Sequence, residues 1–169
     1  MYSFSWRVRY LCMMENNANN AYHSQQDETY HSVRTDWDVT KRILVVDDRN
    51  ELLHLMRRVL EDENYQVSIL QEGKEAFMRV KTTLPDLLIL DLKLGDISGQ
   101  DILKQLKNDS ITADVPVIVY TAAVLEAEEV SQLIQSNPHR FSGVRLLQKP
   151  FELEVLLDAV EQLLNKPVR

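Results

Sequence analysis

Five polar side chains stand at or close after the ends of four apolar segments of this chain, and their types suit phosphoryl chemistry. In chain order they are Asp47, Asp48, Asp91, Thr121 and Lys149. Carboxylates that gather without a counter-ion repel one another, and a divalent cation removes that conflict. Mg²⁺ prefers carboxylates and water and commonly bridges to a phosphoryl group, while lysine and threonine supply a charge and a hydroxyl for phosphate oxygens. The set therefore predicts phosphoryl transfer, which depends on positioning and charge neutralisation.

Apolar segments that alternate with helical patterns must position these side chains. Continuous apolar runs are typical of parallel strands covered on both faces, and apolar residues three or four apart are typical of helices. The predicted strands span 43–46, 67–70, 87–90, 115–120 and 144–147, and the predicted helices span about 50–61, 74–83, 102–106, 125–135 and 153–164. This alternation predicts an α/β fold with a parallel sheet between two layers of helices, in which ligands bind beyond the carboxyl ends of the strands.

Some finer features of the helices also follow from the pattern. The helix over 50–61 is expected to bury one face, formed by Leu52, Leu55, Met56 and Val59. Gly95 and Gly99 are expected in the loop before residues 102–106. The acidic residues near the start of the helix over 125–135 are expected to form a solvated face; they are Glu126, Glu128 and Glu129.

The composition narrows the class of protein. The chain has 169 residues, a net charge of −7 and one cysteine, Cys12. An acidic chain argues against a nucleic-acid partner, which usually requires a basic surface. No apolar run reaches the roughly 18 residues that a membrane span needs, and a single cysteine excludes an internal disulfide. We therefore expect a cytoplasmic protein with neither a nucleic-acid nor a membrane partner.

The character of the chain changes near residue 40. Residues 1–40 are polar, include an asparagine-rich stretch over 16–20 and lack periodic apolar positions. Such a segment buries too little surface to offset the entropy of ordering it. We predict a disordered or loosely attached tail over 1–40 and one domain over 41–169. Met13 and Met14 are alternatives to Met1 as the native start.

Other uses of these residues differ in their requirements. A phosphatase of the haloacid dehalogenase type needs Asp-x-Asp after the first strand, and position 49 is Arg. A P-loop needs Gly-x-x-x-x-Gly-Lys-Ser/Thr, which the sequence lacks. Asp48 alone could cap the following helix, because aspartate is favoured at that position. The joint occurrence of these side chains at four strand ends favours a phosphoryl site over separate structural roles.

Over about residues 41–165 the sequence resembles the receiver domains of response regulators in two-component signalling. The resemblance rests on four motifs and their spacing: Ile43-Leu44-Val45-Val46-Asp47-Asp48, Pro85-Asp86-Leu87-Leu88-Ile89-Leu90-Asp91, Thr121-Ala122 and Lys149-Pro150-Phe151. It implies a flavodoxin-like, doubly wound sheet of five parallel strands in the order 2-1-3-4-5, with helices on both faces, as in the chemotaxis member of the family.

The resemblance also implies how phosphate is captured. Asp91 would be the phosphoacceptor and would form an acyl phosphate. Asp48 and Asp91 would bind Mg²⁺ directly, Asp47 would reach it through water, and the backbone carbonyl of Lys93 would be a further ligand. The phosphoryl donor would be a histidine kinase or a phosphotransfer protein. Such a protein is a switch that phosphorylates and dephosphorylates itself, and it is not a turnover enzyme.

The remaining motifs imply how the captured phosphate is held and sensed. Thr121 would bind a phosphate oxygen and move with it, Lys149 would pair with the phosphate, and Pro150 would follow through a cis peptide bond. The second switch position is Leu146, where the family usually has Tyr or Phe, so an aromatic switch cannot operate as such. The stretch from Thr121 to Lys149 is longer than usual, with the added residues expected around 135–143. Lys93 is expected to lie over the phosphate and slow its hydrolysis.

The output is expected to be a protein contact. Only residues 165–169 follow the last predicted helix, so we expect a stand-alone receiver without an effector domain. Its signal would pass to an unknown downstream protein through the helix over 125–135, the strand over 144–147 and the helix over 153–164, or through a homodimer. The alternative is a pseudo-receiver, a scaffold that binds its partners without phosphorylation.

Overall fold

A computed structural model describes residues 40–165 of the chain. The predicted tail, apart from Thr40, and the alternative start residues lie outside the described residues. The strands are β1 (Arg42–Val46), β2 (Gln66–Leu70), β3 (Leu87–Asp91), β4 (Val117–Thr121) and β5 (Val144–Gln148). The helices are α2 (Asn50–Asp62), α3 (Ala76–Thr83), α4 (Gly99–Asn108), α5 (Val124–Ser136) and α6 (Leu153–Leu164), with a 3-10 helix η2 (Gly73–Glu75) before α3. None of the described helices is long and apolar enough to cross a membrane.

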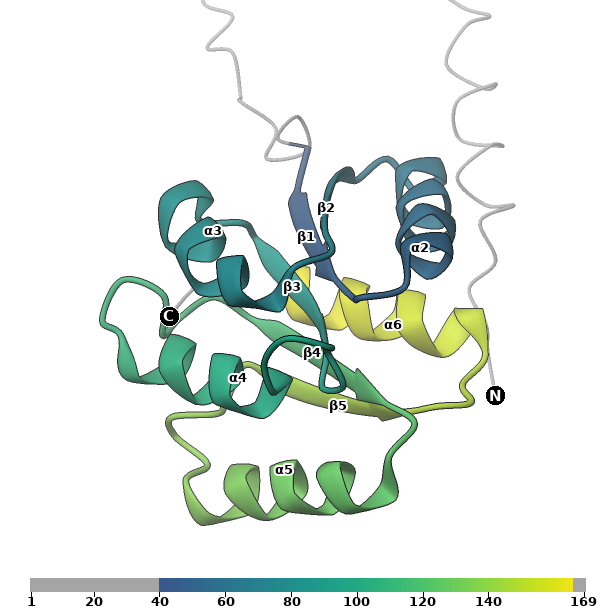
Figure 1. Ribbon diagram of the computed structural model, residues 1–169. Helices are drawn as coiled ribbons and strands as arrows, with labels where there is room; N and C mark the ends of the chain where they lie inside the picture. Colours follow the sequence, from purple (N-terminus) through teal and green to yellow (C-terminus); the bar gives the residue numbers. More distant parts are fainter. Residues whose placement is uncertain (1–39, 166–169) are drawn as a thin grey trace, which may run out of the picture. The chain divides into compact units, whose positions relative to one another are not determined.

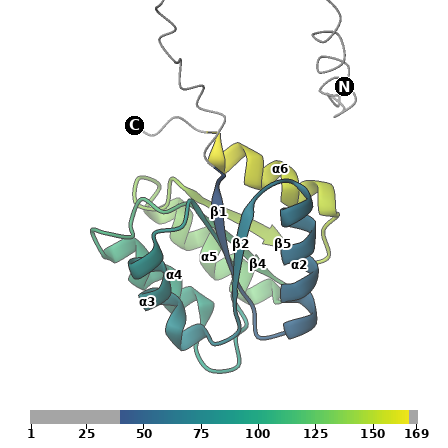
Figure 2. The ribbon, with the colours of Figure 1, turned by 90° about the horizontal axis from the view of Figure 1, so that it is seen from above.

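The strands form one parallel sheet between two layers of helices. Their order is β2-β1-β3-β4-β5, as expected for the flavodoxin-like fold. Helices α3, α4 and α5 cover one face, and α2 and α6 cover the other (Figures 1 and 2). Because all strands run in the same direction, their carboxyl ends lie along one edge of the sheet.

Each face of the sheet has its own apolar core. Leu44, Val46, Leu88 and Leu90 contribute to the core under α3, α4 and α5, while Ile43, Val45, Leu87 and Ile89 contribute to the core under α2 and α6. This division follows from the alternation of side chains along a strand. Every residue of β3 and β4 is buried, so the strands that carry Asp91 and Thr121 are rigidly held.

Two details of the predicted helices were wrong. Leu55 is 58% exposed, and α2 instead buries Leu53, Met56 and Leu60, with Leu52 and Val59 at the margin. The buried residues are three and four apart, so the period was correct but the face was rotated. Gly99 is the first residue of α4 and not part of the loop, because Ser98 caps this helix by accepting a hydrogen bond from the backbone N–H of Gln100 (3.2 Å).

The segment after α5 is anchored by one aromatic side chain. Helix α5 ends at Ser136, and residues 137–143 form turns that lead to β5. Within them Phe141 is buried in the core under α3, α4 and α5. The region expected to hold added residues is therefore an ordered connection that contributes to the core.

Candidate functional site

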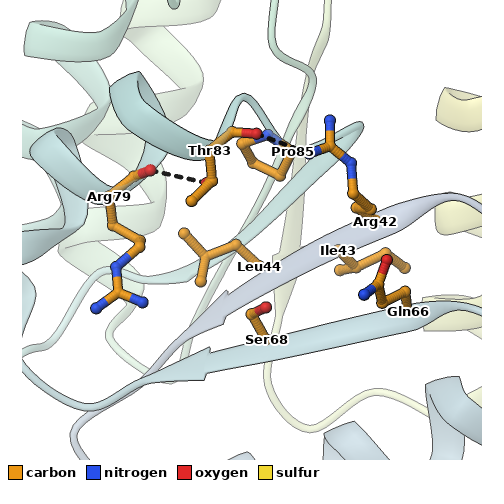
Figure 3. A pocket seen from close by; sticks show the side chains of 8 residues that line it. All are labelled: Arg42, Ile43, Leu44, Gln66, Ser68, Arg79, Thr83 and Pro85. Atoms are coloured by element: carbon orange, nitrogen blue, oxygen red, sulfur yellow. Dashed lines mark hydrogen bonds between the residues drawn. The ribbon is translucent and has the colours of Figure 1, made fainter.

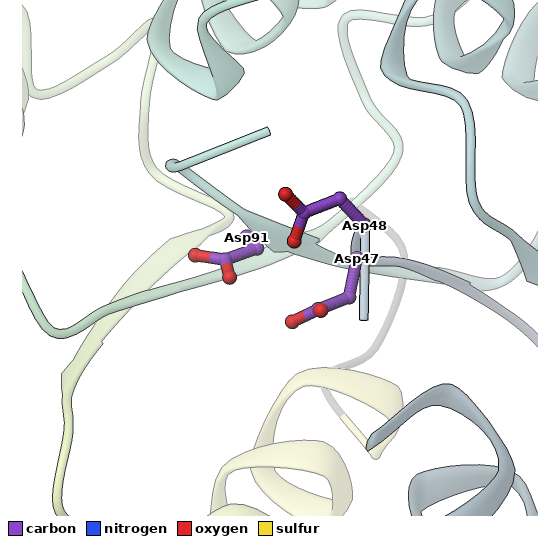
Figure 4. Close-up of side chains that lie close together, drawn as sticks. All are labelled: Asp47, Asp48 and Asp91. Atoms are coloured by element: carbon purple, nitrogen blue, oxygen red, sulfur yellow. The ribbon is translucent and has the colours of Figure 1, made fainter. Parts of the chain in front are cut away.

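The predicted site residues meet at the carboxyl edge of the sheet. Asp91 and Thr121 are the last residues of β3 and β4, Asp47 and Asp48 follow β1, and Lys149 follows β5. Carboxylate oxygens of Asp47, Asp48 and Asp91 lie within 4.8 Å of one another, and Figure 4 shows the three side chains gathered at this edge. Asp47 is fully buried, and Asp91 is nearly so.

Lys149, which follows β5, places its ammonium group against this cluster. Its Nζ lies 3.1 Å from Asp91 Oδ2 and 3.7 Å from Asp47 Oδ2. The same ammonium group lies 4.1 Å from the centre of the Tyr120 ring. The peptide bond between Lys149 and Pro150 is cis, as the family resemblance implied.

Tyr120 is a site residue that the sequence motifs did not indicate. Its buried hydroxyl donates to Asp47 Oδ2 at 2.6 Å. Tyr120 precedes Thr121 on β4, so its side chain points to the opposite face of the sheet. A polar tip within an otherwise apolar strand is the signal that could have identified it, since a buried tyrosine hydroxyl usually needs a partner.

Arg49 is the second side chain that the motifs did not indicate. Its backbone N–H donates to Asp47 Oδ1 at 2.7 Å, and its guanidinium group lies against the same carboxylate. Arg49 is also the N-cap residue of α2, which has no side-chain cap. The alternative role of Asp48 as a helix cap is therefore not observed.

The carboxyl groups of Asp47 and Asp91 differ in their electrostatic surroundings. Burial favours the protonated form of Asp47, but hydrogen bonds from Tyr120 and Arg49 outweigh it and hold the pKa of Asp47 below its ordinary value. Burial, supported by the neighbouring Asp47, raises the pKa of Asp91 despite its contact with Lys149. Burial, and then Asp47, raises the pKa of Tyr120, so its hydroxyl remains a donor. The cluster concentrates more negative charge than its protein partners neutralise, which is the condition that a bound divalent cation relieves.

Thr121 forms a hydrogen bond with Glu126, a residue that was expected to face solvent. Its hydroxyl donates to Glu126 Oε2 at 3.2 Å and accepts from the backbone N–H of Ala123 at 3.0 Å. The prediction of a solvated face was wrong for Glu126, which is half-buried, whereas Glu128 and Glu129 are exposed. A single turn of α5 connects Glu126 to the end of β4, and spacing alone did not show that this turn folds back onto Thr121.

The remaining predicted residues lie near the cluster. Lys93 is exposed, and its backbone N–H donates to Asp91 Oδ1 at 3.2 Å. Leu146 is half-buried and packs against the core under α3, α4 and α5. A hollow of about 400 Å³ opens beside Asp48, and its lining includes Lys74 and Asp96. The cluster can therefore be reached from outside.

A second hollow, of about 220 Å³, lies at the opposite end of the strands. Its lining includes Arg42 and Gln66, the first residues of β1 and β2 (Figure 3). The Arg42 guanidinium donates to the backbone carbonyls of Thr83 (2.9 Å) and Leu84 (2.7 Å). These bonds attach the start of β1 to the end of α3, so Arg42 has a structural role there.

Comparison with known proteins agrees with this arrangement. Residues 43–161 match the response regulator receiver domain family. The chain is 34% identical over 125 residues to the phosphate regulon transcriptional regulatory protein PhoB of Rhizobium meliloti, covering 74% of this chain and 52% of that protein. It is equally similar to the response regulator MprA of Mycolicibacterium vanbaalenii, covering 74% of this chain and 51% of that protein. The chain thus spans about half the length of these relatives.

Solved structures show the same likeness. A CheY-like response regulator receiver domain protein from Methanospirillum hungatei superposes with a TM-score of 0.65 at 26% identity, covering 76% of this chain and 96% of that chain. The signal receiver domain of a signal transduction histidine kinase from Syntrophus aciditrophicus gives the same score and identity, covering 77% of this chain and 96% of that chain.

Proposed function

The chain belongs to the response regulator receiver domain family, and from this premise we propose that Asp91 is the phosphoacceptor of a two-component phosphorelay. One observation carries the proposal: three carboxylates lie within 4.8 Å of one another while Lys149 approaches Asp91 Oδ2 to 3.1 Å. Transfer of a phosphoryl group to a protein needs a nucleophile, a positively charged group that pairs with the phosphoryl oxygens, and a site for a metal ion. The carboxyl edge of the sheet supplies candidates for all three.

The carboxylate cluster fits Mg²⁺, since the ion prefers carboxylate and carbonyl oxygens together with water. Asp48 and Asp91 would hold it directly, with the backbone carbonyl of Lys93, and Asp47 would hold it through water. When bound, Mg²⁺ would supply charge neutralisation around the transferring phosphoryl group. Tyr120 and the Arg49 backbone would keep Asp47 oriented, because both donate to its oxygens.

The transfer itself would use the carboxylate of Asp91 as the nucleophile. A carboxylate oxygen attacks the phosphorus of a phosphohistidine, a P–O bond forms, the P–N bond breaks, and the imidazole leaves with the electron pair and takes up a proton. Lys149 pairs with the phosphoryl oxygens. Water later hydrolyses the acyl phosphate and restores Asp91, so the protein is a switch and not a turnover enzyme. The phosphoryl donor is a histidine kinase or a phosphotransfer protein. The exposed Lys93 slows hydrolysis of the acyl phosphate.

The readout would begin at Thr121. To donate to a phosphate oxygen, its hydroxyl must leave Glu126 in the first turn of α5. Leu146 packs in the core beside this region and cannot act as an aromatic switch. The start of α5 exposes Val124 (55%) and Leu125 (75%), and α6 exposes Val155 (44%). The surface formed by α5, β5 and α6 would therefore transmit the signal to a protein partner or a second copy of the chain in the cytoplasm.

Formation of a phosphoryl or beryllofluoride adduct tests the proposal. The protein, Asp91→Ala and Asp101→Ala would each be treated with acetyl phosphate, or with beryllofluoride, in Mg²⁺. Asp101 is an exposed residue in the first turn of α4 and serves as the control for loss of a carboxylate. Intact mass and oligomeric state are then measured. We expect the adduct in the protein and in Asp101→Ala, and none in Asp91→Ala.

The opposite result is also informative. If no donor, including histidine kinases from the same cell, phosphorylates the protein, the phosphoacceptor proposal fails. The scaffold that acts without phosphorylation would then be the better description.

A further inference from the structure

Arg49 adds a second cation to the carboxylate cluster. Its Nε lies 3.3 Å from Asp47 Oδ1, and its Nη2 lies 3.4 Å from Asp47 Oδ2. The same Nη2 lies 3.9 Å from Asp91 Oδ2. The guanidinium group therefore spans one carboxylate and faces the proposed phosphoacceptor.

Asp91 Oδ2 consequently faces two cations, Lys149 at 3.1 Å and Arg49 at 3.9 Å. The three carboxylates of the cluster carry three negative charges, and these two side chains carry two positive charges. Charge neutrality is therefore approached, but not reached, before any metal ion binds. A metal ion that binds here meets a site in which Arg49 already offsets part of the charge that attracts it.

The two cations differ in how freely they can move. The side chain of Lys149 is 17% exposed, whereas that of Arg49 is 57% exposed. Helix α2 has no side-chain cap and needs only the backbone of Arg49, whose carbonyl accepts from Leu52 and Leu53. The Arg49 side chain can thus turn into solvent without opening a cavity or losing a helix contact, while Lys149 cannot.

We propose that Arg49 is a displaceable counter-cation of the metal site. Its guanidinium group offsets the charge of Asp47 and Asp91 while the site is free of metal, and it gives up this position when a divalent cation binds. The inference rests on the proposed Mg²⁺ site and assigns Arg49 a positioning role, not a catalytic one. The consequence is a lower affinity for the metal than the three carboxylates alone would give.

A titration with Mg²⁺ alone, without a phosphodonor, tests this role by isothermal titration calorimetry. Arg49→Ala and Arg49→Gln both remove the charge, and Arg49→Lys keeps it. Arg58→Ala removes the same charge from an exposed position on α2 and is the matched control. The Arg49 guanidinium lies 3.3 Å from Asp47 and 3.9 Å from Asp91, and charges at such distances near a protein surface attract each other strongly, although exposure to solvent weakens the attraction. Metal binding must overcome this attraction, and the variants without the charge do not have it. We expect Arg49→Ala and Arg49→Gln to bind Mg²⁺ roughly three- to tenfold more tightly than the unsubstituted protein does. The affinities of Arg49→Lys and Arg58→Ala for Mg²⁺ should stay close to that of the unsubstituted protein.

Thermal unfolding provides a second readout that needs no activity. Without metal, Arg49→Ala and Arg49→Gln should unfold at a lower temperature than the unsubstituted protein. The reason is that the repulsion between Asp47 and Asp91 is then compensated by one positive charge fewer. Saturating Mg²⁺ should remove most of that difference.

Two results would overturn the inference while leaving the phosphoacceptor intact. One is Mg²⁺ binding by Arg49→Ala that equals or falls below that of the protein, and the other is an equal gain in Arg58→Ala, which would indicate a general effect of net charge. If the protein itself binds no Mg²⁺, the metal part of the proposed function fails, and the role of Arg49 fails with it.

Discussion

The hydrogen bond between Thr121 and Glu126 would link the proposed phosphate capture to helix α5. The Thr121 hydroxyl has a carboxylate acceptor in Glu126, five residues along the chain, at 3.2 Å. A hydrogen bond to a charged group is stronger than one between neutral groups. Any phosphate oxygen that takes this hydroxyl must compete with Glu126, and the first turn of α5 then loses a contact. Because Leu146 occupies the proposed second switch position, this exchange would be a direct route from a bound phosphate to the surface.

Removal of Glu126 should therefore favour the phosphate-bound state. We predict that Glu126→Ala binds beryllofluoride in Mg²⁺ about three- to tenfold more tightly than the protein, because the Thr121 hydroxyl no longer leaves a charged acceptor. The loss of a carboxylate close to the phosphoryl site acts in the same direction. A titration followed by NMR or tyrosine fluorescence gives the affinity.

Glu128→Ala provides the comparison, since it removes the same charge from an exposed position on the same helix. Equal affinities for Glu126→Ala and Glu128→Ala would show that Thr121 is not restrained by Glu126.

At this scale the motif residues could be placed from the sequence, and their neighbours could not. Asp47, Asp91, Thr121 and Lys149 end or follow predicted strands, so the parallel sheet alone brings them to one edge. Tyr120 reaches the site because its side chain points to the face of the sheet where Asp47 lies. Glu126 reaches it because the first turn of α5 brings it back to Thr121. Neither property is contained in the spacing of a motif, because both depend on the packed backbone.

Among the elements, α4 is positioned by its first residue. Gly99 lies against the end of β3, where an added Cβ would stand 2.2 Å from the Asp91 carbonyl oxygen and 2.7 Å from Leu92 Cα. The Gly99 N–H also donates to the Leu92 carbonyl at 2.9 Å, which closes the loop between β3 and α4. Close approach of two backbones thus requires glycine, and the position of Asp91 depends on it.

A methyl group at this position should disrupt both stability and phosphate capture. We predict that Gly99→Ala lowers the free energy of unfolding by about 3 kcal/mol, at the upper end of overpacking effects, because backbone atoms cannot yield as a side chain does. The surviving folded protein should form the Asp91 adduct slowly. Urea unfolding and the rate of adduct formation measure the two effects.

Gly143→Ala is the matched control. The nearest atom to its Cβ would be Pro116 Cα at 3.6 Å, an ordinary contact, so we expect stability within about 1 kcal/mol of the protein. Similar stabilities for the two variants would contradict the close approach at Gly99.

The pattern predicted the elements well, but not their ends or their orientation. Apolar runs place all of the strands because both faces of the sheet are covered. The predicted face of α2 and the face that is buried have the same helical period. The buried face consists of Leu53, Met56 and Leu60, and only the packing of α2 on the sheet determines which of the two faces is buried. Gly99 suggested a loop by type, whereas tertiary contact places it in a helix.

On the scale of the whole domain, one buried charged side chain among the described residues lies away from the proposed phosphoryl site. Lys107, at the end of α4, is 4% exposed, and its Nζ donates to the carbonyls of Ala113 (2.8 Å) and Val115 (2.7 Å). These bonds join the end of α4 to the segment that enters β4. Burial lowers the pKa of Lys107 from 10.5 to about 8, with a smaller opposing effect from Asp114.

The lowered pKa of Lys107 connects the stability of the domain to pH. Between pH 8 and 10.5 the folded state binds fewer protons at Lys107 than the unfolded state does, so stability increases with pH in this window. The increase amounts to at most about 3 kcal/mol, because a tenfold difference in proton affinity between the two states corresponds to roughly 1.4 kcal/mol.

Comparison with variants that cannot titrate isolates this contribution. Lys107→Met has no charge, and Lys107→Arg keeps its charge throughout the window. Both should lose stability relative to the protein as the pH rises from 8 to 10.5, whatever their difference at pH 7, where Lys107→Met also leaves two carbonyls without their donor. Urea unfolding at several pH values gives the three curves. Parallel curves would show that Lys107 has the same proton affinity in both states, and that its bonds to Ala113 and Val115 compensate fully for its burial.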